Sequence, residues 1–294
     1  MQIIKVGKTL PVKTINEAID LVTEETIIYL KSGFYYEKIK LNKNNIKIIG
    51  EDPEKTIISF DDYALKIHKD GKEYNTFRTY TMFVLANNIT LENLTIENTS
   101  GEGQVVGQAV ALGTTGNNIF INNCILRAHQ DTLFVGPLPK DLIVRYQNFL
   151  PNDELIFPEP HNVYINKSKI IGDVDFIFGA GTCFIDNCEI ISLKHDGFVC
   201  APSTEITDNE GFVFTNCYFR CEYRDTKVFL ARPWRDYGMA KFINCTYQNH
   251  ILDLGFDKWN DTSRDKTARF YEVNGKYEDN HQFTRAYFCK TISK

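Results

Sequence analysis

Short runs of apolar and β-branched residues, separated by clusters of Gly, Asn and Asp, dominate the hydrophobic pattern near the N-terminus. Such runs, bounded by turn-forming residues, are typical of short β-strands. Four of them follow one another closely, at Thr26–Leu30, Lys38–Leu41, Ile46–Ile49 and Thr56–Phe60. The pattern therefore predicts that this part of the chain is rich in β-structure.

One short helix is predicted ahead of these strands. Thr14 and Glu17 stand at the spacing of a capping box, with Thr14 as the N-cap and Glu17 at the N3 position. Apolar residues then recur with helical spacing, at Ile15, Ala18, Ile19 and Val22. A lone amphipathic helix needs a surface to cover, so we expect it to cap the open end of the β-structure.

From residue 89 onward the chain repeats a unit of two β-runs joined by a polar residue, usually Asn. Successive polar anchors are 30, 44, 20, 29 and 28 residues apart. A period of roughly 20 to 30 residues, with the extra length absorbed in loops, is the mark of a stacked solenoid. Because the runs are short and no helix lies between them, we predict an all-β fold, a parallel β-helix. The anchors are Asn93, Asn123, Lys167, Asn187, Asn216 and Asn244.

The repeat runs through most of the chain, so we predict a single domain spanning residues 1–294. The longest step contains an insertion, about 137–160, with five prolines. That many prolines exclude a central strand, and the insertion is expected to form either a rim beside the functional site or a plain surface excursion. The repeat fades after His250, and the tail, about 253–294, is expected to pack on the side or end of the solenoid.

The residue after each anchor is small or apolar, which predicts one interior column through the solenoid. No CxxC or CxxH pair has the spacing of a zinc site, and buried free thiols explain the cysteines without disulfides. Free thiols and an N-terminus without a long apolar segment favour a cytoplasmic location. Secretion is the alternative, if a leader has been removed. The column is Leu94, Cys124, Ser168, Cys188, Cys217 and Cys245.

Composition excludes several classes of protein. Apolar residues make up 43% of the chain and charged residues 24%, which argues against general disorder. The net charge of −5 and the pI near 5.7 argue against a nucleic-acid-binding surface. No apolar run approaches the ~18 residues needed to cross a membrane. We therefore expect neither nucleic acid nor membrane as a partner.

Two acids occupy equivalent positions in neighbouring repeats. Asp131 lies eight residues after Asn123, and Asp175 lies eight after Lys167. Equivalent positions in a parallel stack are about 4.8 Å apart, so the two carboxylates should lie on adjacent rungs. They cannot both ionise freely, and such a pair can supply an ionised nucleophile or base beside a neutral acid. A solvated Asp ladder is the alternative, and the apolar residues flanking both acids argue against it.

Other polar residues could join the two acids. Gln108 and Gln130 carry neutral amide donors suited to an oxyanion, although a ladder of side-chain hydrogen bonds would explain them equally well. Arg232 stands beside Trp234, where it could hold a carboxylate ionised, or the two could form a surface cation–π pair. The six histidines show no metal spacing, so no metal and no cofactor is predicted.

Five motifs together resemble the signature set of the pectin methylesterase (pectinesterase) family. They occur in that family's order and cover nearly the whole chain. The resemblance implies a right-handed parallel β-helix that hydrolyses galacturonate methyl esters in pectin or methylated oligogalacturonides, without a cofactor. The motifs are GFYYEKI from Gly33, GQAVAL from Gly107, QDTLF from Gln130, DFIFG from Asp175 and LARPW from Leu230.

The resemblance also implies roles for the two acids. Asp175 would be the nucleophile that attacks the ester carbonyl at C6 of galacturonate. Asp131 would be the general acid that protonates departing methanol, and then the base that activates water. This would be covalent catalysis by a carboxylate.

The remaining candidate residues would bind and orient by the same resemblance. Gln108 and Gln130 would hydrogen-bond the tetrahedral oxyanion. Arg232 would orient Asp175 and keep it ionised. Trp234 and Phe178 would line the sugar groove, and the enzyme is expected to act as a monomer.

Three other functions stay open at this point. A polygalacturonase or pectate lyase on the same scaffold would cut the polymer chain and leave the ester intact. A related β-helix esterase or thioesterase would act on another substrate. A non-catalytic carbohydrate-binding solenoid would bind without turnover.

Overall fold

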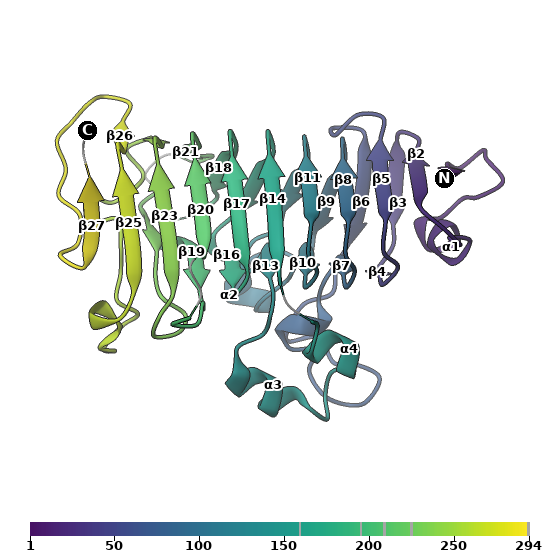
Figure 1. The fold of residues 1–294 in the computed structure, drawn as a ribbon, viewed down its shortest axis with the longest axis horizontal. Helices are drawn as coiled ribbons and strands as arrows, with labels where there is room; N and C mark the ends of the chain where they lie inside the picture. The colour runs from purple at the N-terminus through teal and green to yellow at the C-terminus, as the bar shows by residue number, and fades with distance from the viewer. Residues whose placement is uncertain (159, 195, 208–209, 224–225, 293–294) are drawn as a thin grey trace.

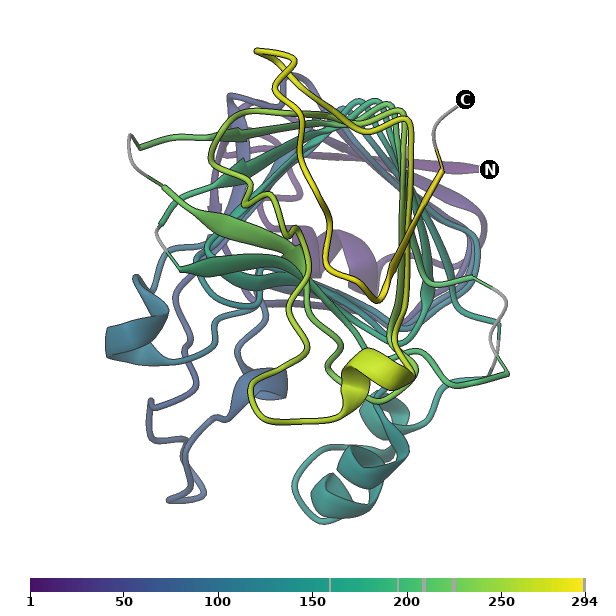
Figure 2. The ribbon, with the colours of Figure 1, turned by 90° about the vertical axis from the view of Figure 1, so that its left-hand side faces the viewer.

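The computed structural model describes residues 1–158, 160–194, 196–207, 210–223 and 226–292. Within these ranges, three parallel sheets run side by side along the molecule, and the chain visits them in turn so that each coil adds one rung to each sheet (Figures 1 and 2). The interior between the sheets is filled by one apolar core. This arrangement confirms the predicted all-β fold, a parallel β-helix.

Sheet A is the longest of the three and has eleven strands in the described part of the chain. All its neighbouring strands pair in parallel. In spatial order they are β1 (Gln2–Val6), β2 (Thr26–Leu30), β5 (Ile46–Gly50), β8 (Ile89–Glu92), β11 (Ile119–Asn122), β14 (Asn162–Asn166), β17 (Thr182–Asp186), β20 (Phe212–Thr215), β23 (Met239–Ile243), β25 (Arg269–Val273) and β27 (Cys289–Ile292).

Sheets B and C complete each coil. Sheet B consists of β3 (Gly33–Tyr36), β6 (Thr56–Phe60), β9 (Thr95–Asn98), β12 (Ile125–Arg127), β15 (Lys169–Gly172), β18 (Glu189–Ser192), β21 (Tyr218–Cys221), β24 (Thr246–Tyr247) and β26 (Lys276–Tyr277). Sheet C consists of β4 (Ile39–Leu41), β7 (Met82–Val84), β10 (Leu112–Thr114), β13 (Leu133–Val135), β16 (Val174–Gly179), β19 (Gly197–Pro202) and β22 (Val228–Ala231).

The four strands predicted near the N-terminus are all present. β2 and β6 have the predicted bounds, and β4 and β5 differ from them by one residue at one end. β1 and β3 were not predicted. Their exposed sides carry apolar side chains, such as Ile3 in β1 and Phe34 in β3, so neither strand shows an alternation of apolar and polar residues. β1 also precedes the helix, and its pairing with β2 is not visible from local sequence.

Helices are few and short within the described residues, and none of them is long and apolar enough to cross a membrane. The capping box at Thr14 and Glu17 is present, and the predicted apolar face of α1 is buried in the core. Figure 2 shows α1 lying across the N-terminal end of the solenoid, as predicted. The helices are α1 (Ile15–Asp20), η1 (Thr76–Arg78), α2 (Gly103–Val106), α3 (Lys140–Tyr146), α4 (Asn152–Leu155) and η2 (Arg264–Lys266).

The polar anchors of the repeat are the turns between sheets A and B. All six have φ between 49° and 55°, the left-handed conformation that Asn tolerates better than most residues. The turns are also joined from coil to coil, as where Asn123 Nδ2 donates to Asn93 Oδ1 at 2.8 Å. Lys167 is the one anchor without an Asn side chain, and the neighbouring turns hold it in the same conformation.

The predicted interior column is also present. Its six residues are buried, with exposed fractions of 2% or less. Two adjacent members of the column are joined by a hydrogen bond, because the Cys124 N–H donates to Ser168 Oγ at 3.0 Å. Burial raises the pKa of the Cys124 thiol to about 12, which makes it a poor nucleophile.

The insertion between β13 and β14 folds into α3 and α4 and projects from one side of the solenoid (Figure 1). It is held to an earlier loop, because the Tyr146 hydroxyl donates to Asn75 Oδ1 at 2.8 Å. It is held to a later loop by Arg235, whose guanidinium donates to both carboxylate oxygens of Asp141 at 3.0 and 2.7 Å. The insertion is thus a tethered wall beside sheet C.

The C-terminal tail differs from its sequence-based description, because it continues the solenoid. β25 and β27 extend sheet A, and β26 extends sheet B. Asn274 is a further anchor, with φ of 52° and a 3.0 Å hydrogen bond to Asn244. The β-runs here are short and rich in charged residues, which concealed a repeat that lies 30 residues beyond Asn244.

We expect thiol reagents to label few cysteines in the native protein. Six of the eight cysteines are buried, and all eight are free thiols. Unfolding should expose nearly all eight, with or without reductant, and a titration in denaturant measures this directly. Unreduced, unfolded protein that shows only a few titratable thiols would contradict the column and would favour the secreted alternative.

Candidate active site

The two predicted acids lie on neighbouring rungs at the start of sheet C. Leu133 pairs with Ile177 in the parallel register of β13 and β16, and each acid lies two residues before its member of this pair. The Asp131 N–H donates to the carbonyl of Val174 at 3.1 Å. The equal offset from the anchors thus brings Asp131 and Asp175 to equivalent positions on adjacent coils.

Both acids occupy unusual backbone conformations. Asp131 has φ of 69° and Asp175 has φ of 49°, in the left-handed region that costs roughly 1 kcal/mol or more for a residue with a side chain. The register of β16 with β19 also shifts between Val174 and Ile177, as expected for a β-bulge. Phe176 and Ile177 both enter the core, which leaves Asp175 and Phe178 outside it.

Burial raises the pKa of both acids, and Arg232 opposes this rise through direct hydrogen bonds only at Asp175. Their exposed fractions are only 7% for Asp131 and 8% for Asp175. Burial, and then the charge of Asp175, raise the pKa of Asp131 well above its ordinary value. Burial also raises the pKa of Asp175, but hydrogen bonds from Arg232 oppose that rise. These directions favour the proton on Asp131 and the ionised form at Asp175.

Arg232 binds Asp175 through both of its carboxylate oxygens. Its Nε donates to Oδ1 at 2.8 Å and its Nη2 donates to Oδ2 at 2.6 Å. The guanidinium lies between two rings, 3.7 Å from the centre of Phe198 and 4.1 Å from that of Trp259. A guanidinium stacked on both faces has little freedom, so the Asp175 carboxylate is fixed in orientation.

Gln108 and Gln130 come together beside the acids. The Ala109 N–H donates to the carbonyl of Gln130 at 3.1 Å, which places the two glutamines on adjacent coils. Gly103 in α2 leaves room for the second amide, because a Cβ there would lie 2.5 Å from Gln130 Oε1. Both side chains are partly exposed, as a donor to a bound substrate must be.

Aromatic residues cover the outer face of sheet C. Trp234 is partly exposed, and its ring meets Phe178 edge-on at 5.7 Å. Phe178 is only 3% exposed, so it supports Trp234 from beneath and offers no open ring face. The apolar residues of this face, which we call the outer cluster, are Phe77, Phe83, Leu85, Val110, Phe134, Leu138, Leu142, Tyr146, Leu150, Leu155, Phe178 and Ala201.

Loops from distant parts of the sequence surround this face. Figure 2 shows α2, the loop that carries η1, and the insertion on the same side of the solenoid. The insertion contributes Leu142 and Tyr146 to the outer cluster. Of the two alternatives for the insertion, this packing favours a rim over a plain surface excursion, and two earlier loops lie on the same side.

Trp259 belongs to the site, although sequence reasoning missed it. Its ring covers Arg232, and its own backbone has φ of 70°. The residue stands in a charged segment without a recognisable motif, so no local pattern marks it. One signal was available, because the chain has only two tryptophans and the other is Trp234.

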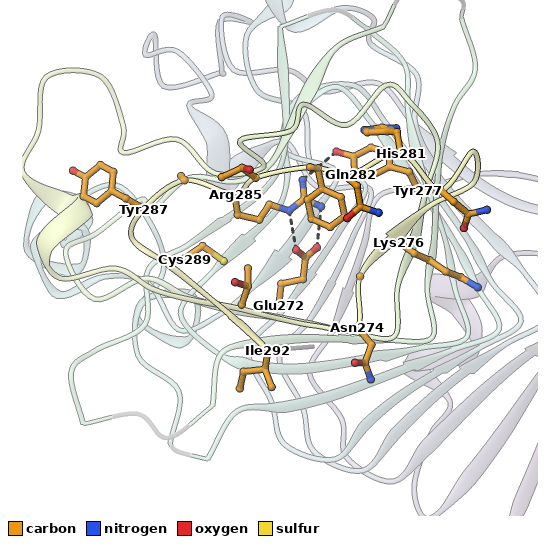
Figure 3. Close-up of a pocket in the computed structure, with 16 residues that line it drawn as sticks. Glu272, Asn274, Lys276, Tyr277, His281, Gln282, Arg285, Tyr287, Cys289 and Ile292 are labelled. Carbon is orange, nitrogen blue, oxygen red and sulfur yellow. Dashed lines mark hydrogen bonds and ion pairs between the residues drawn. The ribbon is translucent and has the colours of Figure 1, made fainter. Parts of the chain in front are cut away.

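A separate cavity of 440 Å³ lies at the C-terminal end of the solenoid and contains none of the predicted site residues (Figure 3). Its buried charges satisfy one another, because Arg285 donates to both carboxylate oxygens of Glu272 at 2.8 and 2.9 Å. Nowhere in the described ranges do three or more His, Cys, Asp or Glu side chains gather as metal ligands. The charged pair that lines this cavity therefore serves to hold the C-terminal end of the solenoid together.

Comparison with curated proteins finds relatives along most of the chain. A petunia (Petunia integrifolia) pectinesterase is 31% identical over 277 residues, which cover 88% of this chain and 66% of the relative. An Arabidopsis thaliana protein named pectinesterase 31 is 28% identical, over 88% of this chain and 77% of its own length. Another from the same plant, named probable pectinesterase/pectinesterase inhibitor 21, is 27% identical, and the chain spans only 37% of it.

Solved structures share the fold. A carrot pectin methylesterase superposes with a TM-score of 0.82 at 21% identity, over 99% of this chain and 88% of its own. One from Erwinia chrysanthemi gives 0.80 at 24% identity, over 98% of this chain and 92% of its own. These are right-handed parallel β-helices. The family model named Pectinesterase matches residues 3–138 and 143–288. The chain therefore belongs to the pectinesterase family.

Proposed function

We propose that this chain hydrolyses methyl esters of galacturonate in pectin or in methylated oligogalacturonides and releases methanol. The observation that carries the proposal is the buried pair of carboxylates, in which Arg232 binds both oxygens of Asp175 and burial raises the pKa of the neighbouring Asp131. An ionised carboxylate and a neutral carboxylic acid on adjacent rungs are the nucleophile and the acid that ester cleavage needs. Membership of the pectinesterase family supports the choice of substrate.

The first half of the reaction would transfer the acyl group to the enzyme. An oxygen of Asp175 attacks the C6 carbonyl carbon, and the negative charge moves to the carbonyl oxygen. Gln108 and Gln130 would donate hydrogen bonds to this oxyanion. The intermediate collapses with cleavage of the bond to the methoxy oxygen, which takes the proton of Asp131 and leaves as methanol. An anhydride between Asp175 and the sugar acid remains.

The second half would release the acid and restore both carboxyl groups. Asp131, now ionised, takes a proton from water as the hydroxyl adds to the C6 carbonyl. Collapse frees the galacturonic acid and leaves Asp175 ionised and Asp131 protonated, as at the start. Arg232 keeps its two hydrogen bonds to Asp175 available throughout, so the nucleophile returns in the same orientation.

The surroundings of the acids support a sugar polymer as the partner. Trp234 presents a partly exposed ring beside the acids, and a flat apolar ring suits the face of a sugar. A solved pectin methylesterase of the same fold carries a hexasaccharide. We propose that one copy of this chain suffices for activity, because Asp131, Asp175, Arg232 and Trp234 all come from it.

A methanol assay tests this function against its rivals. Highly methylated pectin and short methylated oligogalacturonides are incubated with the protein, and methanol and reducing ends are measured in parallel. Methanol without new reducing ends is the expected result, and comparison of the two substrates gives the preferred length. New reducing ends would point to chain cleavage, while neither product would leave a binding protein or an esterase for another substrate.

Loss of the Asp175 carboxylate should abolish turnover. We expect Asp175→Ala to lower kcat by several powers of ten, because no nucleophile remains. Asp175→Asn keeps the shape of the side chain and one of its two hydrogen bonds from Arg232, and it should be as inactive although it still folds. Asp131→Asn should be similarly damaging. A tenth of the wild-type kcat in either Asp175 variant would remove Asp175 as the nucleophile.

Weakening the Arg232 contact should move the acid side of the pH profile. Arg232 lowers the pKa of Asp175, so Arg232→Lys, which loses the two-pronged contact, raises it. Because the nucleophile must be ionised, the acidic limb of kcat/KM shifts to higher pH, by on the order of one pH unit. Arg220→Lys on sheet B is the control, since it disturbs only the pair with Glu189. Coincident acidic limbs in the two variants would refute the role of Arg232.

The two tryptophans should differ in their kinetic effects. Trp234→Ala removes a sugar platform and should raise KM more than it lowers kcat. Trp259→Ala uncovers Arg232 and should lower kcat more than it raises KM. Melting temperatures measured alongside separate these effects from loss of stability. An unchanged KM with a lower melting temperature for Trp234→Ala would assign this ring to the outer cluster.

A further inference from the structure

His129 and Asp173 form a hydrogen-bonded pair beside the catalytic acids and take no part in the reaction steps above. His129 Nδ1 lies 3.1 Å from Asp173 Oδ2. The Asp173 side chain is 2% exposed and that of His129 is 32% exposed. Each stands two residues before an acid, His129 before Asp131 and Asp173 before Asp175. The pair therefore joins the two segments that present the acids.

Hydrogen bonds fix the Asp173 carboxylate in this position. Its Oδ1 accepts from the Val174 N–H at 2.7 Å, and its own backbone N–H donates to the His129 carbonyl at 3.0 Å. With Oδ1 occupied, Oδ2 faces the His129 ring, whose Nδ1 has to be the donor because a carboxylate only accepts. The Asp173 carboxylate is thus held against His129, in the segment that leads into Asp131.

The charge of Asp173 acts on the general acid. Two backbone hydrogen bonds place Asp173 next to the Asp131 segment: the Asp173 N–H donates to the His129 carbonyl at 3.0 Å, and the Asp131 N–H donates to the Val174 carbonyl at 3.1 Å. Burial raises the pKa of Asp131; among the charged groups, Asp175 from β16 raises it, Arg232 from the loop after β22 lowers it, and Asp173 from the turn before β16 raises it. Arg232 is already engaged by Asp175, so Asp173 is a second carboxylate whose charge favours the neutral form of Asp131.

We propose that Asp173, oriented by His129, is a positioning residue that holds the proton on Asp131 and so extends activity to higher pH. This rests on the proposed esterase function, in which Asp131 must carry a proton to release methanol. His129 acts as the hydrogen-bond donor that orients Asp173. A permanent cation at this position would offset the charge of Asp173, because the two groups are in contact.

Four variants separate the charge of Asp173 from its contribution to folding. Asp173→Asn removes the charge but keeps the shape. His129→Lys leaves the buried Asp173 untouched and sets a permanent cation beside it, at a position exposed enough to accept a lysine. His129→Gln keeps a donor and is always neutral. His281→Gln is the matched control, because His281 also contacts carboxylates, at 3.0 and 2.8 Å, but at the C-terminal end (Figure 3).

The measurement is the pH profile of kcat/KM for methanol release from methylated pectin. The alkaline limb reports loss of the proton from Asp131. Asp173→Asn and His129→Lys should shift this limb to lower pH by about half a unit to one unit, a roughly three- to ten-fold loss of kcat/KM above the limb. His129→Gln and His281→Gln should keep the wild-type limb, since neither variant places a permanent positive charge beside Asp173.

Several outcomes would overturn the inference. An alkaline limb shared by His129→Lys and His129→Gln would show that the charge of Asp173 does not reach Asp131, even if Asp173→Asn does not fold. A uniform loss of kcat/KM at every pH, with a lower melting temperature, would assign the pair to folding alone. Either result leaves wild-type methanol release intact. Wild-type protein that releases no methanol would instead refute the proposed function, and this inference with it.

Discussion

The fixed register of the parallel stack is the constraint on which the rest of the structure depends. From β8 onward each coil turns from sheet A to sheet B at a residue in the left-handed conformation, and six of these seven anchors are Asn. A polar turn that repeats in one conformation fixes the register between neighbouring strands. A shift of one residue would exchange the inner and outer faces of the strands. Where no insertion separates a position from its anchor, positions with equal offsets lie on neighbouring coils about 4.8 Å apart, as for Leu133 and Ile177, each ten residues after its anchor.

This constraint brings two carboxylates together at a cost that other residues offset. Two buried like charges repel, and both acids also have left-handed backbones. Arg232 supplies one balancing charge, and the raised pKa of Asp131 favours its uncharged form. Strain and burial of this kind are stable only where a rigid frame imposes them. The stacked strands provide that frame, and the site is consequently preorganised for charge that develops during ester cleavage.

The sequence allowed prediction of whatever the register controls. The strands, the anchors, the interior column and the adjacency of Asp131 and Asp175 all follow from equal offsets. Contacts that depend on loops could not be predicted this way. Trp259 reaches Arg232 from a loop without a motif, and the pairing of His129 with Asp173 requires knowledge of side-chain directions. The last rungs were missed for another reason, because charged strands hide the period that Asn274 keeps.

The division between frame and loops has a chemical consequence. The two carboxylates that would make and break bonds lie at the start of β13 and β16, two central strands of sheet C, where the strand register fixes them. The groups expected to meet the sugar chain, Trp234 and the wall formed by α3 and α4, stand on loops tied to one another through Asp141 and Arg235. Loops accept insertions more readily than strands do, because no register is lost. Substrate length and methylation pattern can therefore change through the wall of the groove while the carboxylate pair stays as it is.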